Sequence, residues 1–308
     1  MVNEIPVLDM NNNPTEDPLW TSFMGHLVHP DFAHPVFMRH NYSAVNLFNL
    51  YAGETVYLIG RGPSLRKHVE NPKIMQMLQH PTITTFAMNT AADIFNNNVN
   101  LWCGVDRMTK FSPQIAKNPN ITKFIPMNRL MPSNFDLRNA DTKRNLAYMN
   151  SDEKKYAALC PNTIGVQTYI VTKQTTKNVT FGNAFLNCPP VLYGVLKGHK
   201  SVLLFAIKIC LLLGFKKIVL LGVDFKMDQK EPYYKNNSSD YNQFHVQHNN
   251  RLYASLTPHM QEIVKLLHGN KSQYRCKIST AVPIEAMPFI PTVNIQQQLE
   301  ADINRKTS

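Results

Sequence analysis

The chain has 308 residues, of which 44% are hydrophobic and 17% are charged, a balance that is typical of a globular protein and excludes a disordered one. Its formal net charge is +11 at pH 7. An excess of this size favours a polyanionic partner such as nucleic acid or a membrane surface, although a basic cytosolic enzyme would show it as well. The basic residues are scattered along the chain and form no basic arm.

The five cysteines lie far apart in the sequence and form no CxxC pair. We therefore expect reduced structural thiols in a reducing compartment. The first residues, MVNEIPVLDMNNN, lack the basic region and the apolar core of a secretory signal. Cytoplasmic residence is the expectation that follows.

Residues 1–50 contain five prolines and an acidic start, so we predict an irregular N-terminal extension lying over the main domain. From Gly53 onward, short apolar runs alternate with helix-length segments, and the first three runs end on Gly, Asn or Asp. This alternation predicts an α/β fold with a Rossmann-like, doubly wound and mostly parallel sheet, in a domain of residues 51–290. The first expected strands are residues 55–59, 82–88, 100–105 and 121–127.

The most apolar part of the sequence lies after residue 200. Residues 201–213 form an almost unbroken apolar run that Gly214 stops, and a second run, residues 218–223, ends on Asp224. We predict a buried helix with a glycine C-cap, followed by a central parallel strand. The helix is too short to cross a bilayer, which needs about 20 apolar residues. Residues 128–198 show few clean periods and predict an inserted helical piece or loops over the site.

Residues 226–257 are polar and rich in Tyr, Asn and His. A loop of that length in a compact domain is usually a lid or a binding loop. We expect next a helix over residues 258–267, with Thr257 as its N-cap and Pro258 at its first position. A last strand over residues 274–279 and a polar C-terminal tail or surface helix, residues 291–308, complete the prediction.

The sequence GRGPSL, residues 60–65, follows the first strand and opens a helix. Gly60 permits a tight turn, and Gly62 lets the backbone approach a ligand. The free N–H groups near Ser64 and Leu65 would face a phosphate. The dinucleotide fingerprint is incomplete, because leucine stands where a third glycine belongs, and no GK[ST] ending marks a Walker loop. A turn that binds nothing is the alternative.

Polar residues close the other expected strands. Asn89 stands where dinucleotide enzymes carry an acid for the ribose; it could bind a base, a ribose or a phosphate, or simply form a turn. Asp106 and Asp224 each close an expected strand that ends in Gly-Val-Asp. Their carboxylates could hold Mg²⁺, accept a hydrogen bond from a ribose hydroxyl, or cap the strand end. Lys200 and Ser201 precede the buried helix, where anion binding and ordinary capping are equally consistent with the sequence.

The predicted lid supplies candidates for proton transfer. Histidine can act as a general base near neutral pH, and tyrosine can donate to a departing phosphate. Any one of these histidines could equally be a surface residue. The candidates are Tyr233, Tyr234, Tyr241, His245 and His248, with His259 at the start of the next helix.

Three features together resemble a known superfamily: the GPSL loop after the first strand, Asn89 at the end of the second, and LGFKKIVLLGVDF, residues 213–225. They resemble the bacterial sialyltransferase-like glycosyltransferases and their relatives of unknown function, which also include archaeal 6-hydroxymethylpterin pyrophosphokinases. The resemblance covers roughly residues 54–290. In the sialyltransferase branch it implies a nucleotide-sugar site that needs no metal, with lid tyrosines at the leaving phosphate and a lid histidine as base. The lid has no clear counterpart of the family's histidine motif.

The residues and the resemblance together give two sets of predicted site residues and no metal ligands. The expected donor is a UDP- or CMP-linked sugar. The donor-binding set is Gly60, Arg61, Gly62, Ser64, Asn89, Lys200, Ser201, Gly222, Asp224, Tyr233, Tyr234 and Tyr241. The catalytic set is Asp106, His245, His248 and His259.

The basic composition, rich in Asn and Met, also resembles that of proteins encoded by tailed phages, which would place the protein in the host cytoplasm. Some such phages carry glycosyltransferases for hydroxymethylated bases in their own DNA. The leading prediction is therefore an inverting glycosyltransferase acting on 5-hydroxymethylcytosine in DNA. The positive charge of the protein would neutralise DNA phosphates, and the target base would be flipped into the pocket. The alternatives are an ATP-dependent pyrophosphokinase, in which Asp106 and Asp224 share Mg²⁺, and a nucleotide-binding module without catalysis.

Overall fold

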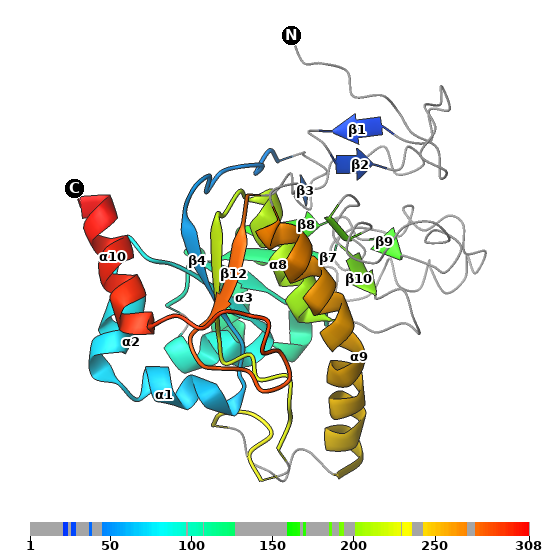
Figure 1. Cartoon of the computed structure of the whole chain (residues 1–308). Helices are drawn as coiled ribbons and strands as arrows, with labels where there is room; N and C mark the ends of the chain where they lie inside the picture. The colour runs from blue at the N-terminus through cyan, green and yellow to red at the C-terminus, as the bar shows by residue number, and fades with distance from the viewer. Residues whose placement is uncertain are drawn as a thin grey trace. The chain divides into compact units, whose positions relative to one another are not determined.

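The computed structural model of the chain has the predicted α/β, Rossmann-like fold (Figure 1). Its main sheet has the strand order β12-β11-β4-β5-β6-β7-β8-β3. Seven of the strands are parallel, and only the edge strand β3 is antiparallel. The described residues are 21–23, 26–28, 37–38, 45–96, 98–106, 108–126, 159–166, 169–170, 185–186, 191–193, 201–228, 230–235, 243–269 and 275–307.

The elements carry the following bounds. The strands are β1 Thr21–Phe23, β2 His26–Val28, β3 Phe37–Met38, β4 Thr55–Ile59, β5 Thr84–Met88, β6 Leu101–Cys103, β7 Thr122–Pro126, β8 Thr163–Val166, β9 Tyr169–Ile170, β10 Val191–Tyr193, β11 Lys217–Leu221 and β12 Lys277–Thr280. The α-helices are α1 Arg66–Val69, α2 Pro72–Leu78, α3 Pro113–Lys117, α8 Val202–Leu212, α9 Gln243–His268 and α10 Ile295–Thr307. Short 3-10 helices are η2 Pro63–Leu65, η3 Asn89–Phe95 and η4 Met108–Lys110.

The chain divides into two compact units. Unit 1 comprises residues 1–48 and 103–209, and unit 2 comprises residues 49–102 and 210–308. Unit 2 contains β4, β5, β11 and β12 together with α1, α2, α9 and α10, and it holds most of the predicted site residues. None of the helices in the described part of the chain has the length and apolarity that a membrane crossing requires.

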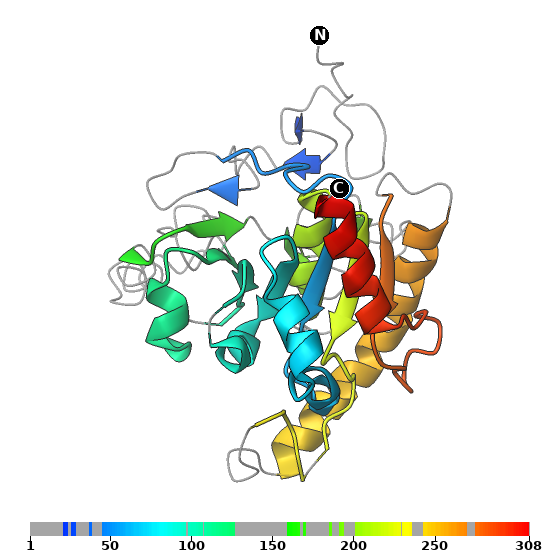
Figure 2. The same cartoon turned by 90° about the vertical axis from the view of Figure 1, so that its left-hand side faces the viewer.

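The parallel strands of unit 2 confirm the strands predicted from apolar runs. In β4, residues 56–59 are fully buried, as expected for a strand covered on both faces. Figures 1 and 2 show α2 and α10 on one face of these strands and α9 on the other. The register pairs Leu221 of β11 with Ile59 of β4, so Gly60 and Gly222 follow at the same edge of the sheet.

The helix α8 and its C-cap also agree with the prediction. Gly214 has φ +86, the left-handed conformation that glycine adopts without a steric cost. Its N–H donates to the Leu211 carbonyl at 3.1 Å, and the Phe215 N–H donates to the Cys210 carbonyl at 3.2 Å. The helix therefore ends where the glycine predicts, and β11 begins at Lys217, three residues after Gly214.

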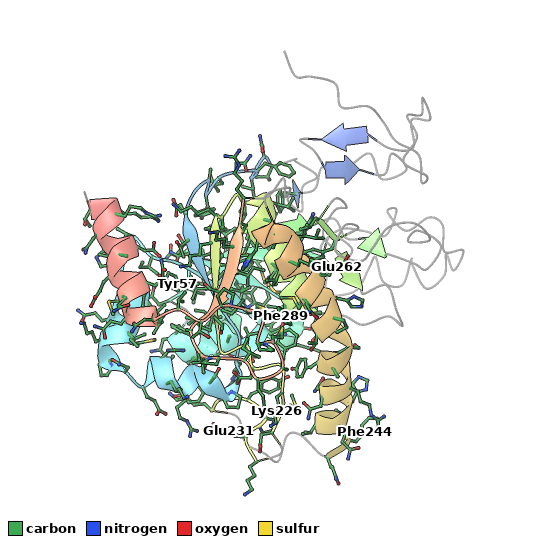
Figure 3. The ribbon with its side chains drawn as sticks, in the orientation of Figure 1. Tyr57, Lys226, Glu231, Phe244, Glu262 and Phe289 are labelled. Atoms are coloured by element: carbon green, nitrogen blue, oxygen red, sulfur yellow. The ribbon has the colours of Figure 1, made fainter. Side chains whose placement is uncertain are left out.

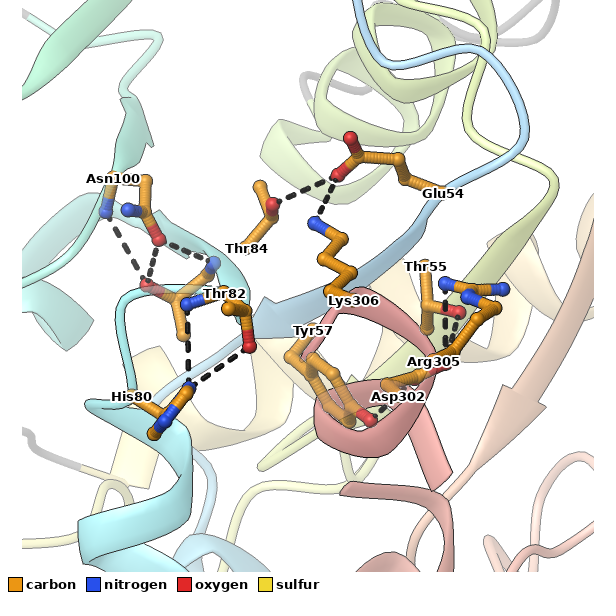
Figure 4. A network of polar contacts seen from close by, with 11 residues as sticks. Glu54, Thr55, Tyr57, His80, Thr82, Thr84, Asn100, Asp302, Arg305 and Lys306 are labelled. Carbon is orange, nitrogen blue, oxygen red and sulfur yellow. Dashed lines mark hydrogen bonds and ion pairs between the residues drawn. The ribbon is translucent and has the colours of Figure 1, made fainter. Parts of the chain in front are cut away.

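The C-terminal helix α10 is fastened to β4 by a buried carboxylate (Figure 4). Asp302 is 5% exposed and accepts hydrogen bonds from the Tyr57 hydroxyl at 2.8 Å and the Thr55 hydroxyl at 3.2 Å. Gln298 donates to the same carboxylate, and Arg305 forms an ion pair with it. Burial first, and the Asp302 charge second, raise the pKa of Tyr57. The polar C-terminal residues thus pack through one acidic side chain.

The helix that we predicted to begin at Pro258 begins at Gln243 instead. Pro258 lies inside α9, where its missing N–H removes one helical hydrogen bond. Val246, Leu256 and Met260 are buried along α9, and this burial supports a helix that begins 15 residues before the predicted start at Pro258. The second half of the predicted lid, residues 243–257, is therefore helical.

An asparagine of α9 binds the backbone of the segment that follows β11. The Asn250 side chain accepts a hydrogen bond from the Met227 N–H at 2.7 Å and donates one to the Met227 carbonyl at 3.0 Å. The carboxamide thus pairs with the backbone as a neighbouring strand would. The Phe225 and Tyr253 rings also lie 5.8 Å apart. Asn250 of α9 therefore holds the chain that follows β11, a contact that the polarity of the sequence alone does not reveal.

Unit 1 contains two buried lysines with carbonyl partners. Lys123 is 0% exposed, and its Nζ donates to the carbonyls of Asn118, Ile121 and Pro161 at 2.6–3.0 Å. Burial lowers the pKa of Lys123 to about 8. Lys208 donates to the carbonyls of residues 185–186. Both lysines therefore pair with backbone carbonyls that lie outside the strands.

The four described cysteines are all buried free thiols, as the sequence predicts. Burial raises the pKa of Cys276 to about 12 and raises that of Cys103 as well. A thiol of this kind is not a reactive nucleophile near neutral pH. The four are Cys103, Cys160, Cys210 and Cys276.

Candidate functional site

The glycine loop (residues 60–64) runs along the carboxyl end of β11. The Gly60 N–H donates to the Leu221 carbonyl and the Gly62 N–H donates to the Gly222 carbonyl, both at 2.8 Å. A Cβ added to Gly60 would lie 2.5 Å from the Gly222 oxygen, and one added to Gly222 would lie 2.6 Å from the Gly60 oxygen. Glycine is therefore required at both positions by the close approach of the two backbones. This requirement holds whether or not a ligand also approaches the loop.

The Asp224 carboxylate lies against the glycine-loop amides, where we expected a phosphate to bind. Its Oδ2 accepts the Ser64 N–H at 2.9 Å, and a Cβ on Gly62 would lie 2.4 Å from the same oxygen. The Leu65 N–H donates to the Gly62 carbonyl. The expectation that these two amides are free is wrong, because the carboxylate after β11 already lies against the glycine loop. The second carboxylate oxygen, Oδ1, takes no hydrogen bond from the described residues.

Asn89 follows β5 with a strained backbone and an unpaired oxygen. Its φ is +49, a left-handed value that asparagine tolerates better than most residues. Its carbonyl accepts the Trp102 indole N–H at 2.7 Å. Its side-chain Oδ1 is buried and has no donor among the described residues, a state that costs about 1–3 kcal/mol. A ligand N–H or hydroxyl at this position would recover that free energy.

Arg61 and Tyr234 hold each other. The Arg61 guanidinium donates to the Tyr234 carbonyl at 3.1 Å and to the Lys235 carbonyl at 3.2 Å. In return, the Tyr234 N–H donates to the Arg61 carbonyl at 2.8 Å. The buried Tyr234 hydroxyl donates to Glu70 at 3.2 Å. Both predicted donor-binding residues therefore fasten residues 230–235 to the glycine loop, and Tyr233 lies half-buried beside them.

The predicted lid histidines lie on α9. His245 and His248 are exposed near its N-terminal end, and their ring centroids lie 6.1 and 6.3 Å from that of Phe244. Figure 3 shows the Phe244 side chain at this end of the helix. His259 is half-buried farther along α9. These histidines therefore lie on a helix and not in the loop that the sequence predicted.

Of four further predicted residues, two take ordinary structural positions and two lie outside the described residues. Asp106 is half-exposed and forms an ion pair with Lys110 at 3.5 Å in unit 1. Ser201 is buried and accepts the Leu204 N–H at 3.4 Å, as an N-cap does. Within the described residues no cluster of three His, Cys, Asp or Glu could hold a metal ion. Lys200 and Tyr241 lie outside the described residues.

His68 is a site residue that the sequence did not indicate. It lies on α1, shortly after the glycine loop, and is 4% exposed, yet in the part of the chain that the structure describes neither of its ring nitrogens has a hydrogen-bond partner. Burial lowers the pKa of His68, the charge of Lys67 lowers it further, and the Asp224 carboxylate acts in the opposite direction. No motif marks a histidine within RKHV, so only the folded arrangement reveals it.

The carboxyl ends of β4, β5 and β11 thus gather a glycine loop, a carboxylate and two residues with unpaired buried atoms. The carboxylate is that of Asp224, and the two residues with unpaired buried atoms are His68 and Asn89. In an open parallel sheet this edge is where ligands bind. A scan of protein-family models and a search of curated proteins both find no match to this sequence.

Proposed function

We propose that this chain is an inverting glycosyltransferase that binds a UDP- or CMP-linked sugar at the carboxyl ends of β4, β5 and β11. The acceptor hydroxyl oxygen attacks the anomeric carbon while the bond from that carbon to the phosphate breaks. The hydroxyl proton passes to a protein base, and the nucleotide leaves as an anion. The motif resemblance supports the reaction type, and the polar groups at this edge of the sheet support a nucleotide ligand.

The observation that carries this proposal is the unpaired Oδ1 of Asn89. A buried acceptor calls for a donor, and a ribose hydroxyl and a base amino group are both donors. Asp224 adds a second acceptor, since its Oδ1 is left open beside the glycine loop. Asn89 and Asp224 follow β5 and β11, the two strands that flank β4, and two acceptors so placed suit a nucleoside, which presents several hydroxyl and N–H donors.

We expect one pyrimidine nucleotide sugar to raise the melting temperature without Mg²⁺, because a ligand that binds only the native state stabilises it. UDP-, CMP-, GDP- and ADP-linked sugars and ATP should be compared with and without Mg²⁺. Asn89→Gly should weaken binding about 10- to 100-fold, through loss of a hydrogen bond of about 1–3 kcal/mol.

The matched control is Asn96→Gly at the other end of η3. Asn96 has φ +48, close to the +49 of Asn89, so glycine relieves the same backbone strain at both positions. Only the Asn89 variant should lose ligand affinity. Equal affinities in the two variants would contradict the proposed role, and a shift that requires ATP with Mg²⁺ would favour diphosphate transfer over sugar transfer.

We further propose DNA that carries 5-hydroxymethylcytosine as the acceptor. The net charge of +11 supports a polyanionic partner. Phe244 supports it too, since its ring is 70% exposed at the end of α9, and residues 243–261 include no acidic side chain. An exposed aromatic ring of this kind can stack on a flipped or unpaired base.

Binding to DNA is expected to fall steeply with salt. Phe244→Ala should weaken it about 10- to 100-fold at fixed salt, as the loss of one stacked base predicts, without changing the salt dependence. Leu159→Ala, which removes another exposed apolar side chain (83% exposed), is the control and should bind normally. Filter binding over a range of salt concentrations measures both quantities, and absence of binding at low salt would rule out a DNA acceptor.

A further inference from the structure

His68 has an unsatisfied buried imidazole at the edge where the proposed ligand binds. Both ring nitrogens are buried without a partner. In the described part of the chain, the only other buried side-chain polar atom in this state is Asn89 Oδ1, at the end of the strand next to β4. Each such atom costs about 1–3 kcal/mol. Buried polar atoms without hydrogen bonds destabilise the fold, and here both residues that carry them lie at one edge of the sheet. This indicates that His68 and Asn89 serve a function other than stability.

An anion at the glycine loop meets a charge of its own sign. The Asp224 carboxylate already accepts the Ser64 N–H, so a phosphate brought to this loop lies beside it. Two like charges 4 Å apart near a protein surface repel by about 4 kcal/mol. Binding therefore needs a positive charge close to Asp224.

The neighbouring arginines have other partners. The Arg61 guanidinium donates to the carbonyls of residues 234–235, and Arg66 pairs with Glu231 at 2.5 Å. His68 is left as a buried group that can gain a positive charge within the field of Asp224. The charged groups on the elements around it are Lys67 and Glu70 on α1, Lys73 on α2, Glu231 on residues 230–235, and Asp224 after β11.

We propose that His68 takes up one proton when an anionic ligand binds at the glycine loop, so that the imidazolium offsets the charge of Asp224. The proton comes from solvent and binds the unprotonated ring nitrogen, and no other bond changes. The identity of the anion, a nucleotide diphosphate, rests on the proposed function, whereas the protonation requires only an anion. His68 is thus a positioning residue, which acts through the charge of Asp224.

The pH dependence follows from the two states of the ring. Without a ligand, burial and Lys67 hold the pKa of His68 below its ordinary value, so the ring is neutral at pH 7. The negative charge of a ligand raises that pKa. Because the bound state has the higher pKa, affinity decreases as the pH rises from the free value to the bound value, by at most about tenfold per pH unit.

The test follows the His68 imidazole by NMR during pH titrations in chloride and in sulfate at equal ionic strength. Sulfate is a divalent anion that does not titrate near neutral pH. UDP-glucose and CMP-N-acetylneuraminic acid serve as nucleotide-sugar probes, and His68→Gln assigns the resonance. We expect sulfate to raise the pKa of His68 by about one unit. His80, which contacts Thr82 before β5 and so lies at the amino ends of the strands, provides the internal reference resonance.

Two variants separate protonation from folding. His68→Leu removes both unpaired nitrogens at similar volume, so its melting temperature should equal or exceed that of the unmodified protein. Its affinity for sulfate should lose the pH dependence, whereas His80→Gln should keep it. An unchanged His68 pKa in sulfate overturns the inference. A shift in sulfate without binding of either nucleotide sugar supports the inference and contradicts the proposed function.

Discussion

Replacing Asp224 by alanine is expected to lower kcat/KM for sugar transfer by about 10²- to 10³-fold. The open Oδ1 of Asp224 is left for a ligand hydroxyl, and a hydrogen bond to a charged group contributes about 1.5–3 kcal/mol. Its Oδ2 accepts the Ser64 N–H at 2.9 Å and so positions the glycine loop, which adds about 1 kcal/mol. The sum of about 2.5–4 kcal/mol corresponds to the expected loss, since each 1.4 kcal/mol is about tenfold.

Asp224→Asn separates the two contributions. Asparagine keeps an oxygen for the Ser64 N–H and removes the charge, so we expect a smaller loss of about 10- to 100-fold. The control is Asp228→Asn, which changes an exposed carboxylate whose described contact is the Lys230 N–H. Initial rates with the nucleotide sugar that stabilises the protein give the comparison. Equal rates for Asp224→Ala and Asp228→Asn would remove Asp224 from the proposed site.

The sequence predicts the sheet of unit 2 well because its strands are buried on both faces. Residues 55–59 and 218–223 are continuous apolar runs bounded by glycine or charged residues, and the structure places β4 and β11 there. The same reasoning misplaces the start of α9. Pro258 is a strong helix-start signal in isolation, but burial of Val246 and the backbone contacts of Asn250 are tertiary effects that outweigh it.

The site is predictable only in part, for a related reason. Motif reasoning finds Gly60, Gly222 and Asp224, because strand ends and glycines are visible in the sequence. It cannot find that Asp224 binds the Ser64 amide, because that contact joins residues 160 positions apart. Nor can it find His68, whose significance lies in what its nitrogens lack. Long-range hydrogen bonds and missing ones are properties of the fold, and local sequence does not encode them.

Gly222→Ala is expected to lower the free energy of unfolding by about 2–5 kcal/mol. Gly222 has φ +62, and a left-handed alanine costs about 1–2 kcal/mol. The new Cβ would also lie 2.6 Å from the Gly60 carbonyl oxygen and 2.8 Å from the Leu65 Cβ. Backbone atoms cannot rotate away as a side-chain end does, so the overpacking adds about 1–3 kcal/mol. Urea unfolding measures the change.

Gly53→Ala is the matched control, because Gly53 has a similar left-handed backbone but no second backbone close to it. The difference between the two variants therefore measures the close approach at Gly222. Gly53 has φ +81, and a Cβ added there meets no atom within 4 Å. It should therefore show only the backbone cost of about 1–2 kcal/mol. Gly222→Ala should in addition push the glycine loop away from Asp224 and abolish stabilisation by the nucleotide sugar, whereas Gly53→Ala should keep it. Equal destabilisation by the two variants would mean that the β4 and β11 ends separate easily, and the glycine loop would then be too loosely held to position a phosphate.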